Sequence, residues 1–154
     1  MEKVSKNLDR KIFHVPLHFI GRDHLVKYIH SWLQDGTHGA AIAILYGIVG
    51  VGKTAIAKTV YNQNFHKFEG RSFLSNVGER SKESNGVVCL QRQLLSDILN
   101  KTADEIHDVD EGIIKIKDAL CCRRTLIVLD DVDKCYQFNA IVDMQNLLFQ
   151  VKSL

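Results

Sequence analysis

The chain contains 154 residues, of which 45% are hydrophobic and 25% are charged, and its formal net charge at neutral pH is +2. This composition is typical of one globular domain, and two full domains are not expected. The near balance of acidic and basic residues gives no indication that nucleic acid is the partner. The longest hydrophobic run, residues 40–46, is far shorter than the ~20 residues that span a bilayer, so we expect no membrane segment.

The amino-terminal residues and the cysteines indicate a cytoplasmic protein, with the nucleus as the alternative compartment. Residues 1–15 contain no sustained hydrophobic pattern, so they are expected to form a leader or linker and not a signal peptide. The four cysteines include the adjacent pair Cys121 and Cys122 and form no C-x-x-C motif. We therefore expect reduced thiols, and no metal site built from cysteine or histidine.

Helices and strands alternate in the first half of the chain. From Arg22, hydrophobic residues recur with helical spacing and predict a first helix. The hydrophobic run of residues 40–46 then predicts a buried parallel strand. A second helix is expected over residues 56–65, and a second strand over residues 71–75.

The second half continues the alternation. After a turn at Asn85-Gly86, the spacing of hydrophobic residues predicts helices over residues 90–99 and 109–120. The run TLIVL, residues 125–129, predicts a third buried strand, and residues 138–148 predict a last helix. Strands that alternate with helices predict an α/β sandwich with a parallel sheet.

The segment GIVGVGKT, residues 47–54, lies between a predicted strand and a predicted helix and satisfies the phosphate-binding pattern G-x-x-x-x-G-K-[ST]. In this pattern backbone N–H groups and the positive end of the following helix bind a polyphosphate. Lys53 is expected to reach the β- and γ-phosphates, and the Thr54 hydroxyl to ligate Mg2+. The alternative without a binding function is a tight strand-to-helix turn with a solvated lysine. The expected nucleotide contacts in this segment are Gly47, Val49, Gly50, Val51, Gly52, Lys53, Thr54 and Ala55.

Two acidic residues follow directly after the third predicted strand. The carboxyl ends of parallel strands lie at the edge where such sheets bind ligands. Asp130 is therefore expected to hold, through its waters, the Mg2+ ion that Thr54 ligates. Asp131 is the candidate catalytic residue, because it could orient or deprotonate an attacking water. The alternative is that both aspartates only cap the following helix.

Two other acidic patterns fail on spacing. Residues 100–104 contain one residue too many for the guanine-reading N-K-x-D pattern, which disfavours guanine as the base. Residues 108–112 lack the ligand spacing of a calcium loop. They are better explained as acidic residues at the start of the helix predicted over residues 109–120.

Three blocks of sequence resemble the NB-ARC nucleotide-binding domain of plant disease-resistance proteins, the TIR-type receptors with leucine-rich repeats. They are FIGR of residues 19–22, GIVGVGKTAIAKTVYN with the later FEGRSFLSNV, and TLIVLDDVD. Asp133, where the coiled-coil branch usually has tryptophan, is similar to the TIR branch. The resemblance implies a P-loop NTPase fold, a three-layer α/β sandwich with a mostly parallel sheet, and it implies that Ile20 and Arg22 contact the adenine base.

The same resemblance implies a function in defence signalling. It implies a switch that binds ADP in the off state and ATP with Mg2+ in the on state, that hydrolyses ATP slowly at most, and that has a full-length immune receptor or another protein as its partner. Val49 stands where the family usually has glycine. Two alternatives remain open: a small P-loop phosphotransferase, that is, a kinase, and a receptor remnant that acts only through protein contacts.

The resemblance also leads us to expect a partial NB-ARC domain over residues 16–150, followed by a tail of residues 151–154. The family's sensor arginine strand, its G-L-P-L helix and its M-H-D motif do not occur in the sequence. In the family the sensor strand lies between the strand before the phosphate loop and the strand before Asp130. We therefore expect a sheet that is incomplete at the C-terminal side, in which these two strands are not neighbours unless they re-pair. We also expect a chain that is marginally stable or needs a partner strand.

Overall fold

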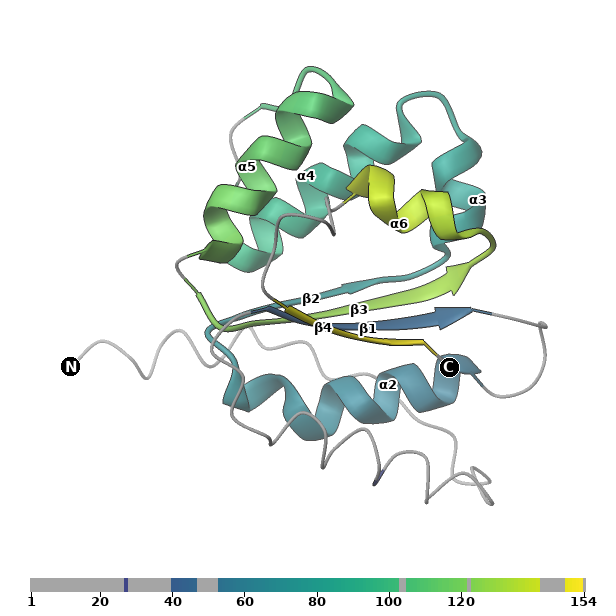
Figure 1. The fold of residues 1–154 in the computed structure, drawn as a ribbon, viewed down its shortest axis with the longest axis vertical. Helices are drawn as coiled ribbons and strands as arrows, with labels where there is room; N and C mark the ends of the chain where they lie inside the picture. Colours follow the sequence, from purple (N-terminus) through teal and green to yellow (C-terminus); the bar gives the residue numbers. More distant parts are fainter. Residues whose placement is uncertain are drawn as a thin grey trace.

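The centre of the molecule is a sheet of parallel strands in the order β2-β3-β1-β4 (Figure 1). The strands are β1 (Ala40–Tyr46), β2 (Gly70–Leu74), β3 (Thr125–Val132) and β4 (Phe149–Ser153). The computed structural model describes residues 27, 40–46, 53–102, 105–121, 123–141 and 149–153.

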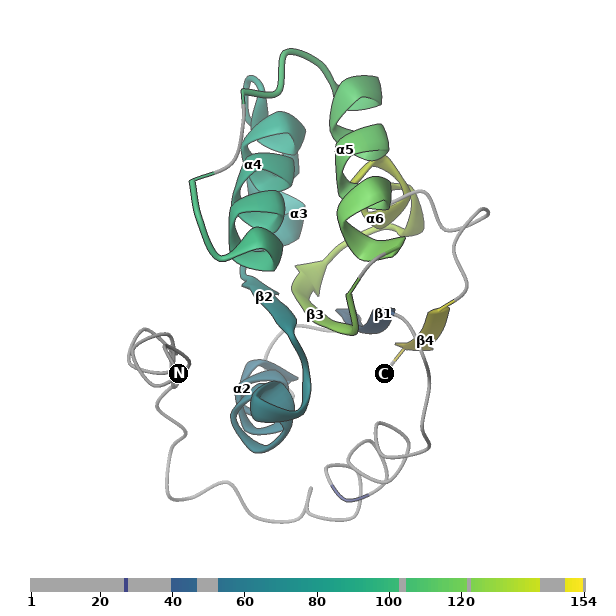
Figure 2. The same ribbon diagram turned by 90° about the vertical axis from the view of Figure 1, so that its left-hand side faces the viewer.

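Helices cover both faces of this sheet (Figures 1 and 2). On one face lies α2 (Lys53–Asn64), which continues into the 3-10 turn η2 (Phe65–Lys67). On the other face lie α3 (Val77–Lys82), α4 (Gly86–Leu99), α5 (Val109–Cys121) and α6 (Cys135–Ile141). The arrangement is the three-layer α/β sandwich that the sequence predicts. Within the described residues, no helix has both the length and the apolar character needed to cross a membrane.

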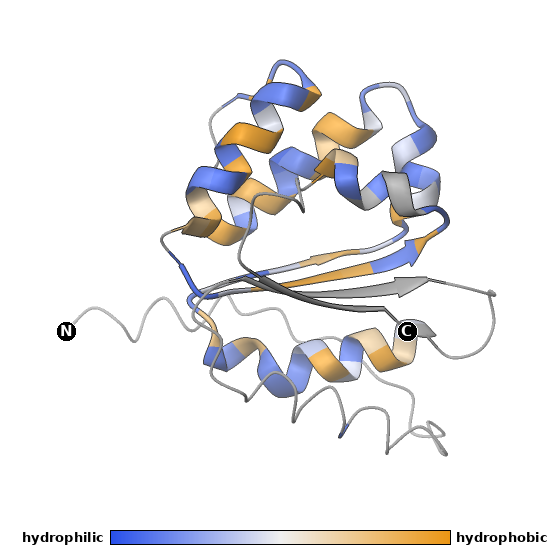
Figure 3. Cartoon of the chain, in the orientation of Figure 1, coloured by the Kyte–Doolittle hydropathy of each residue, from blue (hydrophilic) through white to orange (hydrophobic). Residues whose placement is uncertain are grey.

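Strand β3 is buried because helices cover both of its faces. The hydrophobic side chains of residues 126–129 are each at most 1% exposed. Ile127 and Leu129 belong to one hydrophobic cluster with Leu94 of α4 and Ile116 of α5, and Figure 3 shows hydrophobic residues along the strand and within these helices. Burial on both faces explains why the sequence here is a continuous hydrophobic run and does not alternate with polar residues.

A buried polar side chain joins three helices on the face opposite α2. Gln91 of α4 is 0% exposed. Its Nε2 donates one hydrogen bond to the carbonyl oxygen of Val109, at the start of α5, over 2.9 Å, and another to that of Ala140 in α6 over 3.0 Å. The two bonds satisfy both protons of the side-chain amide and tie the layer together.

Both ends of α4 carry an asparagine in the left-handed backbone region, which asparagine adopts at lower cost than most residues. Asn85 (φ 57°) precedes the helix and Asn100 (φ 56°) follows it. Next to Asn85, a Cβ atom at Gly86 would overlap the carbonyl oxygen of Arg80, so only glycine fits there. These features confirm the predicted turn and the predicted end of this helix.

Strands β1 and β3 are neighbours, which is the re-paired arrangement that the expectation from the sequence left open. They pair directly, from Ala41 with Leu126 to Tyr46 with Val132, and β4 pairs with the other edge of β1. Direct pairing satisfies backbone N–H and C=O groups that would otherwise be buried without partners. In the phosphotransferase alternative these two strands are direct neighbours with no strand inserted between them, so the pairing agrees with that alternative.

Two elements were not predicted, and several predictions fall where the structure gives no description. Helix α3 was not expected from the sequence, and no strand was expected at β4. Of the first predicted helix only Lys27, which is helical, is described. The phosphate loop up to residue 52 and residues 142–148 of the last predicted helix lie outside the described residues.

Candidate functional site

The amino end of α2 and the carboxyl end of β3 meet at one edge of the sheet. β1 ends at Tyr46 and α2 begins at Lys53, so the predicted phosphate loop connects the end of the strand to the start of the helix. Leu45 of β1 is paired with Asp130 of β3. The parallel ladder therefore brings Asp130 to the edge at which α2 starts.

Thr54 and Asp130, the two residues predicted to hold Mg2+, lie in contact. The Thr54 hydroxyl donates a hydrogen bond to the Asp130 carboxylate. Thr54 itself is exposed, whereas Asp130 is only 2% exposed. A solvent-facing hydroxyl beside a buried carboxylate places two oxygen ligands of the kind that Mg2+ prefers on neighbouring elements.

The pKa of Asp130 is raised above its ordinary value, chiefly because burial disfavours the charged carboxylate, and the neighbouring Asp131 carboxylate adds to the effect. Three groups oppose the rise: the Thr54 hydroxyl, the backbone N–H of Asp131 and the positive charge of Lys58. Lys58 lies one turn beyond Thr54 on α2 and was not among the residues expected at the site. The i, i+4 spacing from the motif threonine is the signal that could have found it.

One oxygen of Asp130 lacks a hydrogen-bond partner. Its Oδ1 atom is buried and accepts no hydrogen bond within the part of the chain that the structure describes. A buried carboxylate oxygen in this state is costly unless a cation or a donor compensates it. The residues present therefore fit a divalent cation held by Thr54 and Asp130.

The described residues contain no group of three or more His, Cys, Asp or Glu side chains that could hold a metal ion. A Mg2+ ion at Thr54 and Asp130 would take its remaining ligands from phosphate and water, which is its usual coordination in nucleotide sites. The ion would neutralise phosphate charge there. Free thiols are found at Cys89 and Cys121, both exposed.

The alternative that both aspartates cap the next helix does not agree with the structure. Asp130 and Asp131 lie within β3, and α6 begins only at Cys135. The start of α6 is capped by Gln137, whose Oε1 accepts hydrogen bonds from the backbone N–H groups of Asp133 (2.9 Å) and Lys134 (3.2 Å). The two aspartates are thus available for a role at the edge of the sheet.

Asp131 occupies an unusual backbone position. It is half-buried, its φ angle is 58°, and the register between β1 and β3 shifts by one residue beside it. The structure places it next to Asp130 in β3, and its catalytic role stays a prediction.

Asp133, the residue that is similar to the TIR branch, forms an ion pair with Lys82 of α3. Its Oδ2 lies 3.1 Å from the Nζ of Lys82 at the end of α3. It also lies so close to Gly78 that a Cβ atom there would overlap its carboxylate. The hydrogen bond with Asp133 raises the pKa of Lys82. The residue therefore connects the segment after β3 to α3.

The remaining predicted contacts are only partly described. Ala55 lies half-buried in the first turn of α2, where its carbonyl oxygen accepts a hydrogen bond from Thr59 Oγ1 over 2.8 Å. Lys53 is the first residue of α2. The predicted contacts that lie outside the described residues are Ile20, Arg22, Gly47, Val49, Gly50, Val51 and Gly52.

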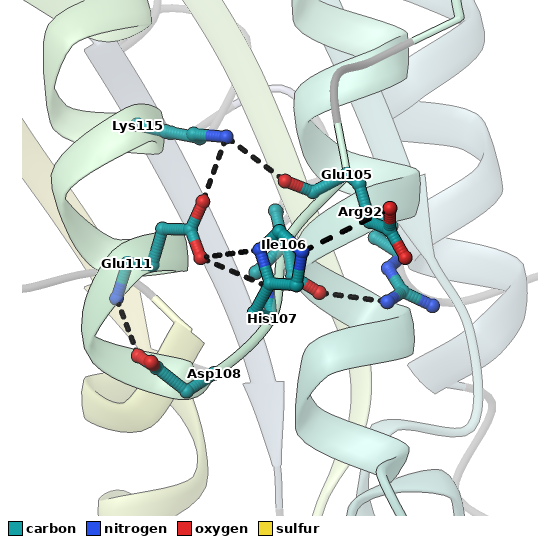
Figure 4. Close-up of polar contacts among 7 residues, drawn as sticks. All are labelled: Arg92, Glu105, Ile106, His107, Asp108, Glu111 and Lys115. Atoms are coloured by element: carbon teal, nitrogen blue, oxygen red, sulfur yellow. Dashed lines mark hydrogen bonds and ion pairs between the residues drawn. The ribbon is translucent and has the colours of Figure 1, made fainter.

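A second polar cluster lies between α4 and α5, and Figure 4 shows its contacts. Asp108 Oδ1 accepts the backbone N–H of Glu111 over 2.8 Å and so caps α5. Glu111 in turn accepts the backbone N–H of His107 over 3.0 Å and pairs with Lys115 over 2.9 Å. These contacts confirm that the acidic residues at 108–112 belong to a helix start.

The sequence profile of the NB-ARC domain matches residues 22–146 of this chain. The chain belongs to the NB-ARC family. Its NB-ARC sequence is 37% identical over 133 residues to disease resistance protein RUN1 of Vitis rotundifolia, a match that covers 86% of the chain and 10% of that protein. The identity to RPV1 of the same species is 36% over 140 residues, which covers 90% of the chain and 10% of RPV1.

The TMV resistance protein N of Nicotiana glutinosa is 29% identical over 139 residues, which covers 86% of this NB-ARC chain and 12% of that relative. The chain thus spans about a tenth of the length of these curated relatives. Family membership establishes the P-loop NTPase fold and a nucleotide-binding module of the plant disease-resistance type. It agrees with the meeting of Thr54 and Asp130 at the edge of the sheet.

Proposed function

We propose that this chain binds an adenine nucleotide, ADP or ATP, with Mg2+ where α2 begins and β3 ends. The observation that carries the proposal is the hydrogen bond from Thr54 to a buried Asp130 whose Oδ1 has no partner among the residues that the structure describes. In the proposed complex, residues 47–54 hold the phosphates, Lys53 neutralises their charge, and Thr54 and Asp130 hold the cation. Ile20 and Arg22 are proposed to contact the base.

We further propose that this nucleotide serves as the switch of an immune-receptor-type protein. ADP and ATP differ by one phosphoryl group, so a site that contacts the γ-phosphate through Lys53 and Mg2+ can bind the two with different strength. Asp131 remains the candidate for orienting an attacking water during slow hydrolysis. The relatives RUN1, RPV1 and N are named as resistance proteins, which supports defence signalling as the setting and a full-length receptor as a partner.

Titration calorimetry with MgADP and MgATP tests the proposed site. We expect Lys53→Ala to weaken binding by at least about tenfold, because it removes a charge that contacts phosphate. Lys101→Ala is the matched control, since Lys101 is exposed beyond the end of α4. The end of α4 lies next to Gly70, and Gly70 pairs with Thr125, the first residue of β3. Lys101 is therefore near the start of β3, whereas Asp130 is near its end.

The titration has three informative outcomes. Binding that is lost in Lys53→Ala and kept in Lys101→Ala supports the nucleotide module. Equal affinity of Lys53→Ala and the unchanged chain would show that the site is assigned wrongly. Absence of binding in the unchanged chain would favour the remnant that acts through protein contacts.

The direct pairing of β1 with β3 favours a second candidate, a P-loop phosphotransferase. Kinases of that kind carry arginine-rich lids over the phosphates, whereas Arg123 and Arg124 of this chain precede β3, at the end of the strand opposite to Asp130. The Arg124 guanidinium lies 4.9 Å from the centre of the Phe68 ring, where it cannot contact a phosphate next to Thr54. Phosphorus NMR with ATP and small hydroxyl acceptors separates the two candidates, because only the phosphotransferase yields a phosphorylated acceptor.

A further inference from the structure

Basic residues gather at the end of the sheet where α2 ends and where β2 and β3 begin (Figure 1). Residues 66–71 and 123–124 together contain four lysine or arginine residues and a single acidic residue, Glu69. Their formal charge of +3 therefore exceeds the +2 of the whole chain. The proposed nucleotide site lies at the other end of β3, so it does not explain this concentration of positive charge.

Two arginines from separate parts of the chain converge on the segment that joins η2 to β2. The Arg71 Nη1 atom donates hydrogen bonds to the carbonyl oxygens of Phe68 over 3.3 Å and Glu69 over 3.4 Å. The Arg124 guanidinium lies 4.9 Å from the centre of the Phe68 ring. The carbonyl oxygen of Arg124 accepts hydrogen bonds from the backbone N–H groups of Glu69 over 2.9 Å and Gly70 over 3.2 Å. These contacts hold both guanidinium groups beside Phe68.

Lys67 adds a third positive charge to this group. Its Nζ donates a hydrogen bond to Asn64 Oδ1 over 3.1 Å, which holds the ammonium group at the end of α2. Burial lowers the pKa of Lys67, and the positive charge of Arg124 lowers it further. Like charges at such short range repel one another, and an anion bound between them offsets the repulsion. We refer to Lys67, Arg71 and Arg124 as the basic surface.

The surroundings of the basic surface favour a peptide over nucleic acid or a membrane. The aromatic rings next to its arginines, Phe65 and Phe68, are only 8% and 3% exposed, so they cannot stack on nucleic-acid bases. Among the described residues the only exposed large hydrophobic side chain is Ile114 of α5, so the surface has no hydrophobic anchor for a membrane. The exposed Glu69 repels a continuous polyanion, whereas spaced carboxylates of a peptide can avoid it.

We propose that the basic surface is a docking site for an acidic peptide segment of a partner protein. Carboxylates of the segment would pair with Lys67, Arg71 and Arg124, and the planar guanidinium groups suit carboxylates because they can donate two parallel hydrogen bonds. The inference goes beyond the proposed function, because the surface and the nucleotide site lie at opposite ends of β3. Docking does not require that the chain bind a nucleotide.

An NMR titration of the chain with a peptide of alternating glutamate and glycine residues tests the proposal. We expect the peptide to bind, the matching peptide of glutamine and glycine not to bind, and the affinity to fall as the salt concentration rises. A double variant, Lys67→Gln with Arg124→Gln, should lose about fivefold in affinity, because two charge pairs are removed. Lys134→Gln, at an exposed position beyond the other end of β3, is the control and should keep its affinity.

The position of the amide resonances that move keeps this inference separate from the proposed function. Movement confined to residues 66–71 and 123–125 supports docking, even in a chain that binds no nucleotide. Movement at Lys53 and Thr54 instead would show that the peptide occupies the predicted phosphate loop, and would overturn the proposal. Lys67→Glu reverses one charge and leaves the contact of Arg124 with Phe68 intact, so it replaces the double variant if that variant does not fold.

The proposal is also overturned by any of three further results. The first is that the glutamate peptide moves no resonance of the unchanged chain. The second is that it binds the double variant as tightly as the unchanged chain. The third is that single-stranded DNA of the same charge, or phosphatidylserine vesicles, bind the basic surface at least as tightly as the peptide, which would identify a nucleic-acid or membrane surface.

Discussion

Two carboxylates of this chain, Glu111 at the start of α5 and Asp130 at the end of β3, have opposite environments. Glu111 accepts hydrogen bonds from Lys115 and from the backbone of His107, and chiefly the bond with Lys115 lowers its pKa from 4.5 to about 2. Asp130 is buried, its Oδ1 lacks a partner among the described residues, and burial raises its pKa. The first carboxylate stabilises the fold as it stands, whereas the second is poorly compensated until something binds it.

This difference teaches where to look for function in the molecule. A carboxylate with all of its partners has little to gain from a ligand, so the Glu111 cluster has a structural explanation alone. A carboxylate held in place by two donors and left with a bare buried oxygen lowers stability in the free protein and gains from a cation. The predictions below change one of these two environments at a time.

The largest effect is expected for Asp130→Asn. The neutral amide loses the charge that attracts Mg2+, so we expect MgATP affinity to fall by about 2 kcal/mol, about thirtyfold, and ADP affinity to fall less. The same change removes the buried charge, so the free energy of unfolding of the nucleotide-free protein should rise by about 1 kcal/mol.

Calorimetry and thermal unfolding measure the two effects of Asp130→Asn. Asp118→Asn, on an exposed position of α5, is the matched control and should change neither. A variant that loses stability and keeps its affinity for MgATP would contradict the difference drawn between the two carboxylates.

A smaller loss of stability is expected at the start of α5, for Asp108→Ala. Asp108 accepts the backbone N–H of Glu111 at the start of α5, and loss of such a cap costs about 1 kcal/mol of stability. Urea unfolding measures the loss, and nucleotide affinity should not change. Asp110→Ala, in the same helical turn and exposed, is the control that should cost less. Equal losses in both variants would argue against the cap.

The smallest expected effect is the contribution of Glu111 to the pH dependence of the free energy of unfolding. Because its pKa is about 2 in the folded chain and 4.5 ordinarily, its stabilising contribution is complete above pH 4.5 and is lost as the pH falls towards 2. We therefore expect Glu111→Gln to show a shallower loss of stability over this interval than the unchanged chain. Thermal unfolding between these pH values measures the loss of stability, and Glu83→Gln, at an exposed position, is the control. Identical slopes of stability against pH for Glu111→Gln and the unchanged chain would refute the prediction.

Much of the fold could be predicted because local patterns encode it. The hydrophobic run TLIVL predicts β3, and the spacing of hydrophobic residues predicts α4 and α5. The spacing over residues 56–65 predicts most of α2, which begins three residues earlier, at Lys53. Of the predicted cation ligands, the structure brings Thr54 and Asp130 into contact, and the cation itself stays a prediction.

The other features depend on distant parts of the chain, which local patterns do not encode. Helix α3 is six residues long, too short for hydrophobic periodicity to indicate it. The adjacency of β1 and β3 follows from which strands are available to pair, not from either sequence alone. The bulge at Asp131 arises because alternation would bury a charge, a conflict that becomes visible only when the core on one face is known.

The side chain of Gln91 has a consequence for how the molecule unfolds locally. Its amide bonds to the backbones of α5 and α6 from within α4, so separation of α4 from either helix breaks a hydrogen bond of a buried side chain. Native-state hydrogen exchange should therefore detect one cooperative opening of all three, with a common free energy, and not three independent fluctuations.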